Sequence, residues 1–579
     1  MKDKKIIILS IVGVLLLVSI VVATSYAYFT ANVTGNKDTN NVVVTNGVMA
    51  LEYKDGDDIN LANAVPGNSV SKTFTVKNTG NVSTNYTIYF SELSNKFVDK
   101  TDLVYTLTSS DGGKNVAQKQ VPSTNDAMVS NYAIDAGKTH TYTLTITFLN
   151  KDENQNDNMN VSFSTKVSIN ETKEYVEPEY TDNVIAEAPE LAQGMIPVKF
   201  DDSGNVVVAD THAKWYDYEA HEWANAVLVN CADNAIKSKY FDSNNKVLAS
   251  AVGKTISMDE IMQMYVYIPR YKYQLFNAED GTSVEQAINI TFESKTTAKS
   301  TGTKNGEWLT HPAFTFGDKE LAGIWVGKFE TSNTSELPKI VPNVRSIRNI
   351  IVSAQFNTSR LMTTTLASTY GTSTSDDSHM MKNMEWGAVA YLSSSIYGRY
   401  TNASTCIASG CEVWINNNNN YTTGCAGSSV SAGSTSTCNA WNTATGVNAS
   451  TTGNIYGIYD MSGGAYEYVM GNYNDTISNA GFSSMPEAKY YDKYTGTDSD
   501  SDFTKYHLGD ATKETLKKKS TEQNAWYGDY SKSVRSSTPW VYRGGKYGDG
   551  TYAGVFDFRS FGGSCDYWEY SFRIAFSAL

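Results

Sequence analysis

Hydrophobic and polar residues alternate strictly in the N-terminal third of the chain. In the stretch TYTLTITF at 141–148, Tyr142, Leu144, Ile146 and Phe148 share one face and threonines occupy the other. The stretch VSFSTKVSI at 161–169 repeats the pattern. Period-2 alternation is typical of strands with one buried and one wet face, as in antiparallel sheets. We therefore expect an all-β sandwich over residues 28–172.

Two further runs in this region are separated by a turn signal. The stretch VSKTFTVKNTG at 70–80 ends in Asn-Thr-Gly, and a second β-like run follows at 86–90. Asn and Gly between two such runs favour a strand, a turn and a strand. We interpret the whole region as a stalk that holds the following domain away from the membrane.

From residue 188 to 579 the pattern is mixed. Runs rich in aromatic and β-branched residues at 215–229, 264–276 and 321–332 indicate strands. The stretch HMMKNMEWGAVAYL at 379–392 has apolar residues near helical spacing, and 347–356 favours a shorter helix. One large α+β domain is expected here.

Two segments lack such patterning. Residues 173–187 are acidic and have no apolar periodicity, which is typical of a linker. Residues 401–452 are rich in Ser, Thr, Asn and Gly, with an asparagine run at 416–420, and are predicted to be a surface insertion.

The first 27 residues form a targeting segment. Three lysines at positions 2, 4 and 5 precede an apolar run at 6–23. Eighteen helical residues span about 27 Å, close to the hydrocarbon thickness of a bilayer. Basic residues before the run keep the N-terminus in the cytoplasm, so the rest of the chain is exported. Cleavage as a signal peptide and retention as a membrane anchor both remain open, since Ser25-Tyr26-Ala27 fits a cleavage site.

Charge and cysteine usage exclude several classes of function. The net charge is −14, and an acidic chain argues against a nucleic-acid partner. None of the six cysteines forms a CxxC pair, which argues against structural zinc. Cys406 with Cys411 and Cys425 with Cys438 are plausible disulfides outside the cytosol. The acidic run starting at Asp498 lacks the glycine and the terminal glutamate of an EF-hand calcium loop, so no metal site is predicted there, although a looser calcium site remains open. No cofactor is predicted.

The last 42 residues, 538–579, contain 12 aromatic residues, more than twice the 12% of the whole chain. Glycines and single charges are interleaved with them, and no 3.6-residue period is present. Tyr and Trp supply contact area at low entropic cost, while Gly and Ser let loops adapt. This composition is typical of a recognition surface; the alternative is an aromatic core that closes a β domain.

Several motifs resemble known families. The stretch GIYDMSGGAYEY at 457–468 resembles the signature of the formylglycine-generating-enzyme and sulfatase-modifying-factor family, which has a C-type-lectin-like fold. NMEWGAVAYLS at 383–393 and the YRGG and SFR motifs at 542–545 and 571–573 are similar to other parts of that family. The opening SYAYFTANVTGN at 25–36 resembles camelysin-type secreted proteins of Gram-positive bacteria, and residues 65–88 resemble Ig-like spacer domains of bacterial surface proteins.

Catalysis is not expected. The oxidases of that family use two cysteines near the C-terminus to bind copper, whereas Cys565 is the only cysteine after Cys438. GxSxG, HExxH and Walker motifs are also absent from the sequence.

The chain is more similar to the variable proteins of diversity-generating retroelements. These proteins resemble the formylglycine-generating-enzyme fold but have lost the catalytic activity. In those proteins the segment between an RGG and a terminal SFR is rewritten, so the resemblance implies a variable region at 542–573. It implies scaffold roles for Arg543, Gly544, Gly545, Phe572 and Arg573, with both arginines bonded to backbone carbonyls or a buried carboxylate. The AGVF stretch at 553–556 would be an internal scaffold strand.

The same resemblance assigns ligand binding to side chains that point into solvent on one face. These are Lys546, Tyr547, Asp549, Thr551, Tyr552, Asp557, Phe558, Arg559, Ser560, Phe561, Ser564, Asp566, Tyr567, Trp568 and Glu569. The resemblance thus implies a cell-surface or secreted protein that binds a protein or glycan outside the cell and is not an enzyme. The alternative function is a structural fibre protein with a passive C-terminal cap. Cys565 would be an acquired thiol or, alternatively, the partner of Cys231.

Overall fold

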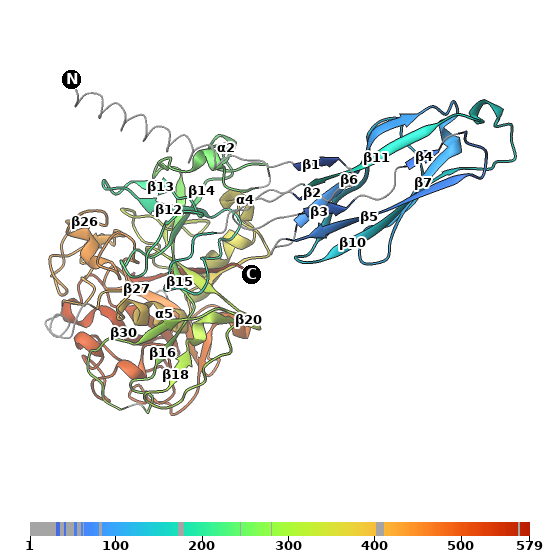
Figure 1. Cartoon of the computed structure of the whole chain (residues 1–579). Helices are drawn as coiled ribbons and strands as arrows, with labels where there is room; N and C mark the ends of the chain where they lie inside the picture. The colour runs from blue at the N-terminus through green and yellow to red at the C-terminus, as the bar shows by residue number, and fades with distance from the viewer. Residues whose placement is uncertain are drawn as a thin grey trace, which may run out of the picture. The chain divides into compact units, whose positions relative to one another are not determined.

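The chain divides into two compact units, Met1–Glu177 and Pro178–Leu579 (Figure 1). The computed structural model describes residues 31–34, 40–41, 51–54, 59–61, 63–79, 84–171, 179–243, 245–279, 281–400, 410–564 and 568–579. The targeting segment predicted at 1–27 lies outside these ranges. In the part of the chain that is described, no helix is long and apolar enough to cross a membrane.

The first unit contains two antiparallel sheets. One has the order β1-β11-β6-β9, with β4 on β11, and the other has the order β2-β3-β5-β10-β7-β8. The strands are β1 (Ala31–Thr34), β2 (Asn40–Asn41), β3 (Leu51–Lys54), β4 (Ile59–Leu61), β5 (Ser69–Asn78), β6 (Thr84–Asn95), β7 (Leu103–Ser109), β8 (Val116–Gln120), β9 (Ala127–Ile134), β10 (Thr139–Phe148) and β11 (Phe163–Glu171).

The alternation seen in the sequence sets the packing of these sheets. Along β10 every second residue is buried, and the four apolar residues from Tyr142 to Phe148 are all inaccessible. Side chains of both sheets share one hydrophobic core. The hydroxyl groups of Tyr86 on β6 and Tyr142 on β10 lie 2.6 Å apart and join the two layers. The predicted two-sheet arrangement is therefore present.

Both strands predicted at 70–80 and 86–90 are present, as β5 and β6, but they belong to different sheets. β5 pairs with β3 and β10, whereas β6 lies between β11 and β9 in the other sheet. The chain crosses from one sheet to the other between them. A local turn signal does not specify which strands pair, because pairing is decided by which buried faces meet across the core.

The second unit is built on a seven-stranded sheet of order β13-β12-β14-β15-β21-β32-β24. Its strands are β12 (Ile196–Phe200), β13 (Val206–Val208), β14 (Asn225–Val229), β15 (Ile261–Pro269), β21 (Gly323–Gly327), β24 (Asp377–Met380) and β32 (Ile574–Ser577). The final strand inserts between β21 and β24, with Trp325 opposite Phe576 and His379 opposite Ala575. The end of the chain thus completes the central sheet.

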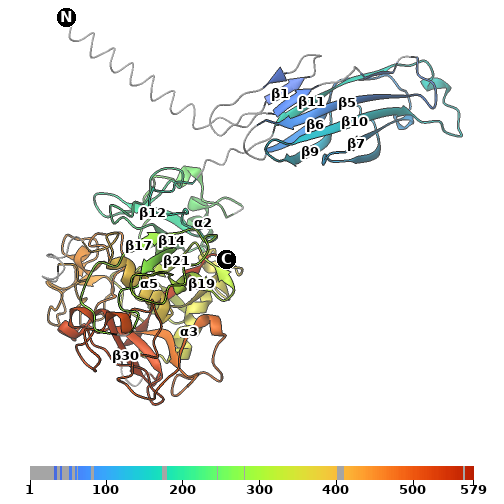
Figure 2. The ribbon, with the colours of Figure 1, turned by 60° about the horizontal axis from the view of Figure 1, so that its bottom comes forward.

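A five-stranded sheet carries the C-terminal segment. Its order is β28-β27-β29-β30, and β31 pairs in parallel with β27. The strands are β27 (Tyr466–Tyr473), β28 (Asp492–Tyr494), β29 (Trp540–Gly544), β30 (Gly554–Phe561) and β31 (Tyr570–Phe572). In Figure 2 the red β30 lies in the lower part of this unit. β29 and β30 are antiparallel neighbours, with Arg543 opposite Phe558.

Smaller sheets complete the second unit. They are the three-stranded β17-β16-β18 and the pairs β19-β20, β22-β23 and β25-β26. Their strands are β16 (Tyr271–Gln274), β17 (Ile290–Phe292), β18 (Trp308–Thr310), β19 (Thr315–Phe316), β20 (Lys319–Glu320), β22 (Ser332–Thr334), β23 (Leu337–Lys339), β25 (Cys425–Ala426) and β26 (Asn439–Ala440). Of the strand-like run predicted at 215–229, only Asn225–Val229 is a strand.

The α-helices among the described residues of this unit are few and short. They are α2 (Asn234–Tyr240), α3 (Val352–Arg360), α4 (Ala367–Tyr370) and α5 (Asn383–Ser393). The predicted helix at 379–392 is confirmed from Asn383 onward. It starts there because Glu385 accepts a hydrogen bond from the Lys382 backbone, which caps the first turn. All residues of α5 are buried, so it is a core helix.

Two predictions for irregular segments need correction. The linker predicted at 173–187 contains the unit boundary, but Asp182 caps the backbone of Val184 and Ile185, and Ile185 is buried in the second unit. A short acidic segment can therefore pack once its carboxylates find backbone donors. The insertion predicted at 401–452 is partly internal, because within the described residues most of 411–418 and 421–427 are buried, whereas 428–445 are mostly exposed or half-buried.

Candidate functional site

The predicted ligand-binding residues fall on two loops and one strand. The loop between β29 and β30 carries Lys546, Tyr547, Asp549, Thr551 and Tyr552. β30 itself carries residues 557–561, and the loop between β30 and β31 carries residues 564–569. Asp566 and Tyr567, together with Cys565, lie outside the described residues. The two loops are adjacent, because the Nζ atom of Lys546 lies 2.7 Å from the Oε1 atom of Glu569.

Part of this set lies at the surface, as predicted. Trp568 is 74% exposed and Tyr552 is 37% exposed, and Thr551 is also exposed. Five further residues of the predicted set are half-buried: Lys546, Tyr547, Asp549, Phe561 and Glu569. We refer to these eight residues as the closing face. It presents aromatic rings and paired charges from the two loops and the end of β30.

The prediction is wrong for Asp557, Phe558, Arg559, Ser560 and Ser564, which are all buried. Strand alternation explains most of this result. Phe558 points into the core, where its ring packs against Phe503 and Tyr506. Ser560, on the same side, donates a hydrogen bond to the backbone oxygen of Ser533.

Asp557 and Arg559 point to the other side of β30 and neutralise each other. The Nη2 atom of Arg559 lies 2.6 Å from Asp557 and 2.7 Å from Asp549. Burial raises the pKa of Asp557 to about 7, and the charge of Arg559 opposes that shift. The guanidinium group also stacks over Tyr530, 4.5 Å from the ring centroid. These residues form a supporting layer beneath the closing face.

The scaffold roles predicted for the two arginines agree with their hydrogen bonds. Arg543 is fully buried and donates to the backbone oxygens of Asp510, Ala511 and Val555. Arg573 is fully buried and forms a two-point ion pair with Glu467, at 2.5 and 3.0 Å. Arg573 also donates to the backbone oxygens of Gly327 and Tyr459, so both arginines hold backbone segments together, as the motif resemblance implies.

Steric constraints explain why the two residues after Arg543 are glycines. Gly544 and Gly545 both have positive φ angles, 85° and 72°. A Cβ atom on Gly545 would lie 2.5 Å from the Cα atom of Ala553. Only glycine tolerates this combination of left-handed backbone and close approach. The first loop thus leaves β29 at a fixed point and returns at Ala553.

Side chains outside the predicted segment also contribute. The ring of Tyr421 packs edge-on against Tyr547, with centroids 5.0 Å apart. The guanidinium group of Arg348 lies 3.7 Å from the centroid of the Tyr421 ring and donates to the backbone oxygen of Trp568. Sequence reasoning missed Tyr421 and Arg348. The available signal was an isolated tyrosine directly after the asparagine run.

Asn416, Asn417 and Asn418 of the asparagine run are buried, which corrects the prediction of a surface insertion for this part of the segment. The side chain of Asn416 donates to Asp460, and that of Asn418 donates to the backbone oxygens of Ser436 and Thr437. The disulfide between Cys425 and Cys438 is present, as predicted. Amide side chains replace apolar packing here because each one satisfies backbone groups that a loop leaves unpaired.

The other cysteine predictions have mixed outcomes. Cys411 is disulfide-bonded, and its predicted partner Cys406 lies outside the described residues. Cys231 is a buried free thiol, which contradicts the alternative pairing with Cys565.

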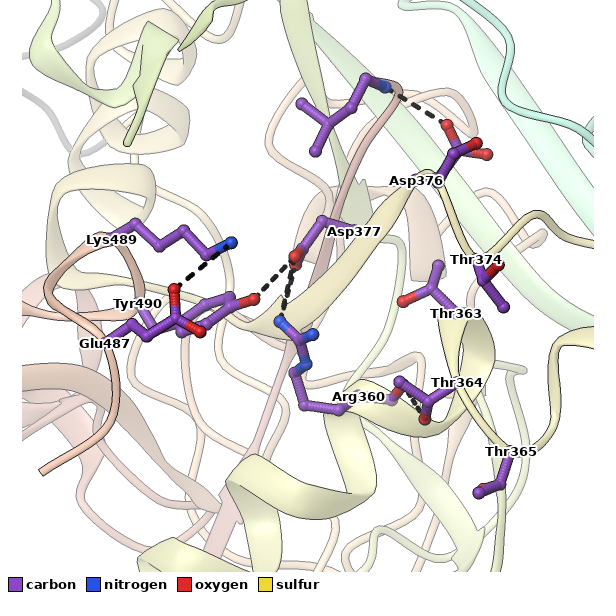
Figure 3. A pocket seen from close by; sticks show the side chains of 12 residues that line it. Arg360, Thr363, Thr364, Thr365, Thr374, Asp376, Asp377, Glu487, Lys489 and Tyr490 are labelled. Carbon is purple, nitrogen blue, oxygen red and sulfur yellow. Dashed lines mark hydrogen bonds and ion pairs between the residues drawn. The ribbon is translucent and has the colours of Figure 1, made fainter. Parts of the chain in front are cut away.

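A separate hollow of about 610 Å³ lies beside the C-terminus (Figure 3). Its wall is an ion-pair network centred on Asp377, which binds Arg360 at 3.0 Å and accepts a hydrogen bond from Tyr490 at 2.8 Å. His379 lies between Asp377 and Glu385, at 3.1 and 2.9 Å. Burial alone would lower the pKa of His379, but the two carboxylates raise it to about 9.

The charged side chains of this network therefore form ion pairs and hydrogen bonds with one another. Across the described residues, no group of three or more His, Cys, Asp or Glu side chains is arranged to hold a metal ion. The closing face, by contrast, leaves the aromatic side chains of Trp568 and Tyr552 exposed to a partner. No protein-family model matches the chain, and no curated protein matches it either.

Proposed function

We propose that this protein is a cell-surface or secreted ligand-binding protein, whose closing face is a diversifiable recognition surface on a C-type-lectin-like scaffold. On this proposal buried residues fix the scaffold, and the side chains of the closing face can be replaced without altering it. The ligand is a protein or glycan outside the cell, and no reaction is catalysed.

One contrast supports the proposal most directly. Arg543 and Arg573, which flank the segment, are fully buried and bonded to backbone atoms, whereas Trp568, between them, is 74% exposed. An exposed tryptophan is unusual in a soluble unit, and Trp and Tyr are the residue types most enriched at the centres of protein interfaces. Rigid strands below such rings reduce the entropy lost on binding.

The resemblance to variable proteins of diversity-generating retroelements supports the second part of the proposal, that the closing face can be diversified. The AGVF stretch forms the start of β30, with Ala553, Val555 and Phe556 buried. Substitutions on the closing face would leave these contacts unchanged. The buried residues Asp557, Phe558, Arg559, Ser560 and Ser564 are then scaffold rather than ligand contacts.

A display experiment tests the proposal. The full chain is displayed with Lys546, Tyr547, Thr551, Tyr552, Trp568 and Glu569 randomised, and the library is selected against several unrelated soluble proteins. A control library of equal size randomises exposed positions far along the sequence from the closing face, such as Lys304, Asn305, Asp318 and Lys319. We expect specific binders from the first library only. Equal yields from both libraries, or loss of folding in most members of the first, would contradict the proposal.

A further inference from the structure

The charges on the closing face are paired except at one margin. Lys546 pairs with Glu569 at 2.7 Å, and Arg559 pairs with Asp549 at 2.7 Å. Arg348, beside them, has no carboxylate within ion-pair distance among the described residues. Among the described residues its buried Nε atom has no acceptor, and its hydrogen bond runs from Nη1 to the backbone oxygen of Trp568.

A second arginine lies close by. Arg345 is exposed, and its backbone pairs with Thr422 next to Tyr421. Burial lowers the pKa of Arg348 and the positive charge of Arg345 lowers it further, while Tyr421 and the more distant carboxylates of Glu330 and Glu569 oppose that shift. Among the described residues no acidic side chain forms an ion pair with Arg345 either. Two cations are thus held together in a chain whose net charge is −14.

The orientation of Arg348 is fixed by its neighbours. Its guanidinium plane lies on the ring of Tyr421, at 3.7 Å, and that ring is itself held by the edge contact with Tyr547. Tyr421 is only 8% exposed and has a positive φ of 57°, an uncommon conformation for a tyrosine. A stacked guanidinium group loses little further freedom when it binds an anion, and its planar fork matches a carboxylate.

We infer that Arg348 and Arg345 form a binding subsite for a carboxylate at the margin of the closing face. The inference rests on the proposed function, and it adds the chemical class of one ligand group. Trp568 and Tyr547, next to Arg348, would contact the organic frame that carries the carboxylate. A polyphosphate is disfavoured because the acidic chain repels highly charged anions. The carboxylate can come from an acidic sugar or from an Asp or Glu side chain.

The test uses arrays that separate these two sources. One arm carries glycans that end in N-acetylneuraminic or glucuronic acid, each beside the same glycan with a neutral terminal sugar. The other arm carries peptides with a single Asp or Glu, each beside its Asn or Gln counterpart. The full-length wild type is compared with Arg345→Gln/Arg348→Gln and with Lys304→Gln/Lys319→Gln, a control that removes the same charge at exposed positions.

We expect the wild type to bind carboxylated probes of one arm and not their neutral counterparts. Arg345→Gln/Arg348→Gln should weaken that binding at least tenfold, and the lysine control should bind like the wild type. Because Arg348 is half-buried, Arg345→Gln alone, at an exposed position, shows whether a loss of binding reflects a loss of folding. It should weaken binding in part.

Three results would overturn the inference: no carboxylated probe is bound, neutral counterparts bind equally well, or the arginine variant binds like the wild type. The proposed function is judged separately by Tyr547→Ala/Trp568→Ala. If that variant loses binding of neutral probes while the arginine variant keeps it, the closing face binds ligand without a carboxylate subsite. If neither variant changes any binding, the proposed function fails as well.

Discussion

The carboxylate group of Asp529 occupies the space that a side chain on Gly554 would need. A Cβ atom at residue 554 would lie 2.1 Å from Oδ2 and 2.2 Å from Oδ1 of Asp529. The Oδ2 atom accepts a hydrogen bond from the backbone of Phe556, 2.9 Å away. A buried carboxylate thus fixes the first residues of β30, directly after the loop that carries much of the closing face.

This contact makes Gly554→Ala destabilising. The added methyl group must displace Asp529 or the strand, and overpacking of this kind costs about 1–3 kcal/mol. Chemical denaturation of the full chain measures the loss in the second unit. Gly548→Ala is the matched control, because a Cβ atom there has no neighbour within 4 Å. If both variants lose the same stability, Asp529 does not hold the strand in this way.

The closing face and its supporting layer should differ sharply in their tolerance to substitution. The triple variant Thr551→Ser/Tyr552→Ser/Trp568→Ser alters only exposed side chains and should change the unfolding free energy by less than about 1 kcal/mol. Phe558→Ala empties a fully buried site and should cost about 3–5 kcal/mol. Urea denaturation followed by tryptophan fluorescence compares them. A large loss in the triple variant would mean that these side chains are part of the core.

Sequence patterns predicted the regular parts of this fold because their periodicity is local. The alternation at 141–148 predicted β10, and the helical spacing near Met384 predicted most of α5. The partners of β5 and β6 were not predictable in the same way. Which sheets they join depends on contacts with strands far away in the sequence, such as β10 and β11.

The sequence predicted where the candidate site lies along the chain, but not which of its residues are buried. The motifs around Arg543 and Arg573 identified the two ends of the segment. Composition could not separate exposed from buried charges within it, because Asp557 and Arg559 are buried only by virtue of pairing with each other. Tyr421 and Arg348 were missed because they lie more than a hundred residues upstream and reach the face only through the tertiary fold.

Arg573 should be far more important for stability than Arg535, a half-buried arginine in the same unit. Arg573→Met leaves Glu467 as an uncompensated buried carboxylate and removes hydrogen bonds to the backbone oxygens of Gly327 and Tyr459, so a loss of about 3–5 kcal/mol is expected. Arg535→Met, which breaks an ion pair of 3.5 Å with Asp500 near the surface, should cost no more than about 1 kcal/mol. Thermal and urea denaturation report both changes. Similar losses in the two variants would mean that the pair with Glu467 is not a structural requirement.

Glu514 should make the second unit less stable as the pH rises. Burial raises the pKa of its carboxyl group from 4.5 to about 7, while hydrogen bonds from Gly509, Tyr391 and Tyr273 oppose that shift. The folded chain therefore holds this proton more tightly than the unfolded chain does. The stabilisation is fully present below pH 4.5 and is lost as the pH rises through about 7, which corresponds to roughly 3 kcal/mol.

The variant Glu514→Gln isolates this effect, because glutamine keeps an acceptor oxygen but does not ionise. The unfolding free energy of the wild type, minus that of the variant, should fall between pH 4.5 and pH 7.5, with most of the fall complete by about pH 7. Glu487→Gln is the control, since the side chain of Glu487 is 75% exposed and lies in water in the folded and unfolded chain alike. Urea denaturation at each pH gives the unfolding free energies of the wild type and of both variants. The difference between the wild type and each variant is then compared across the pH range. A wild-type advantage that stays constant or grows with pH would show that Glu514 is already ionised in the folded protein, held by its three donors against the loss of hydration.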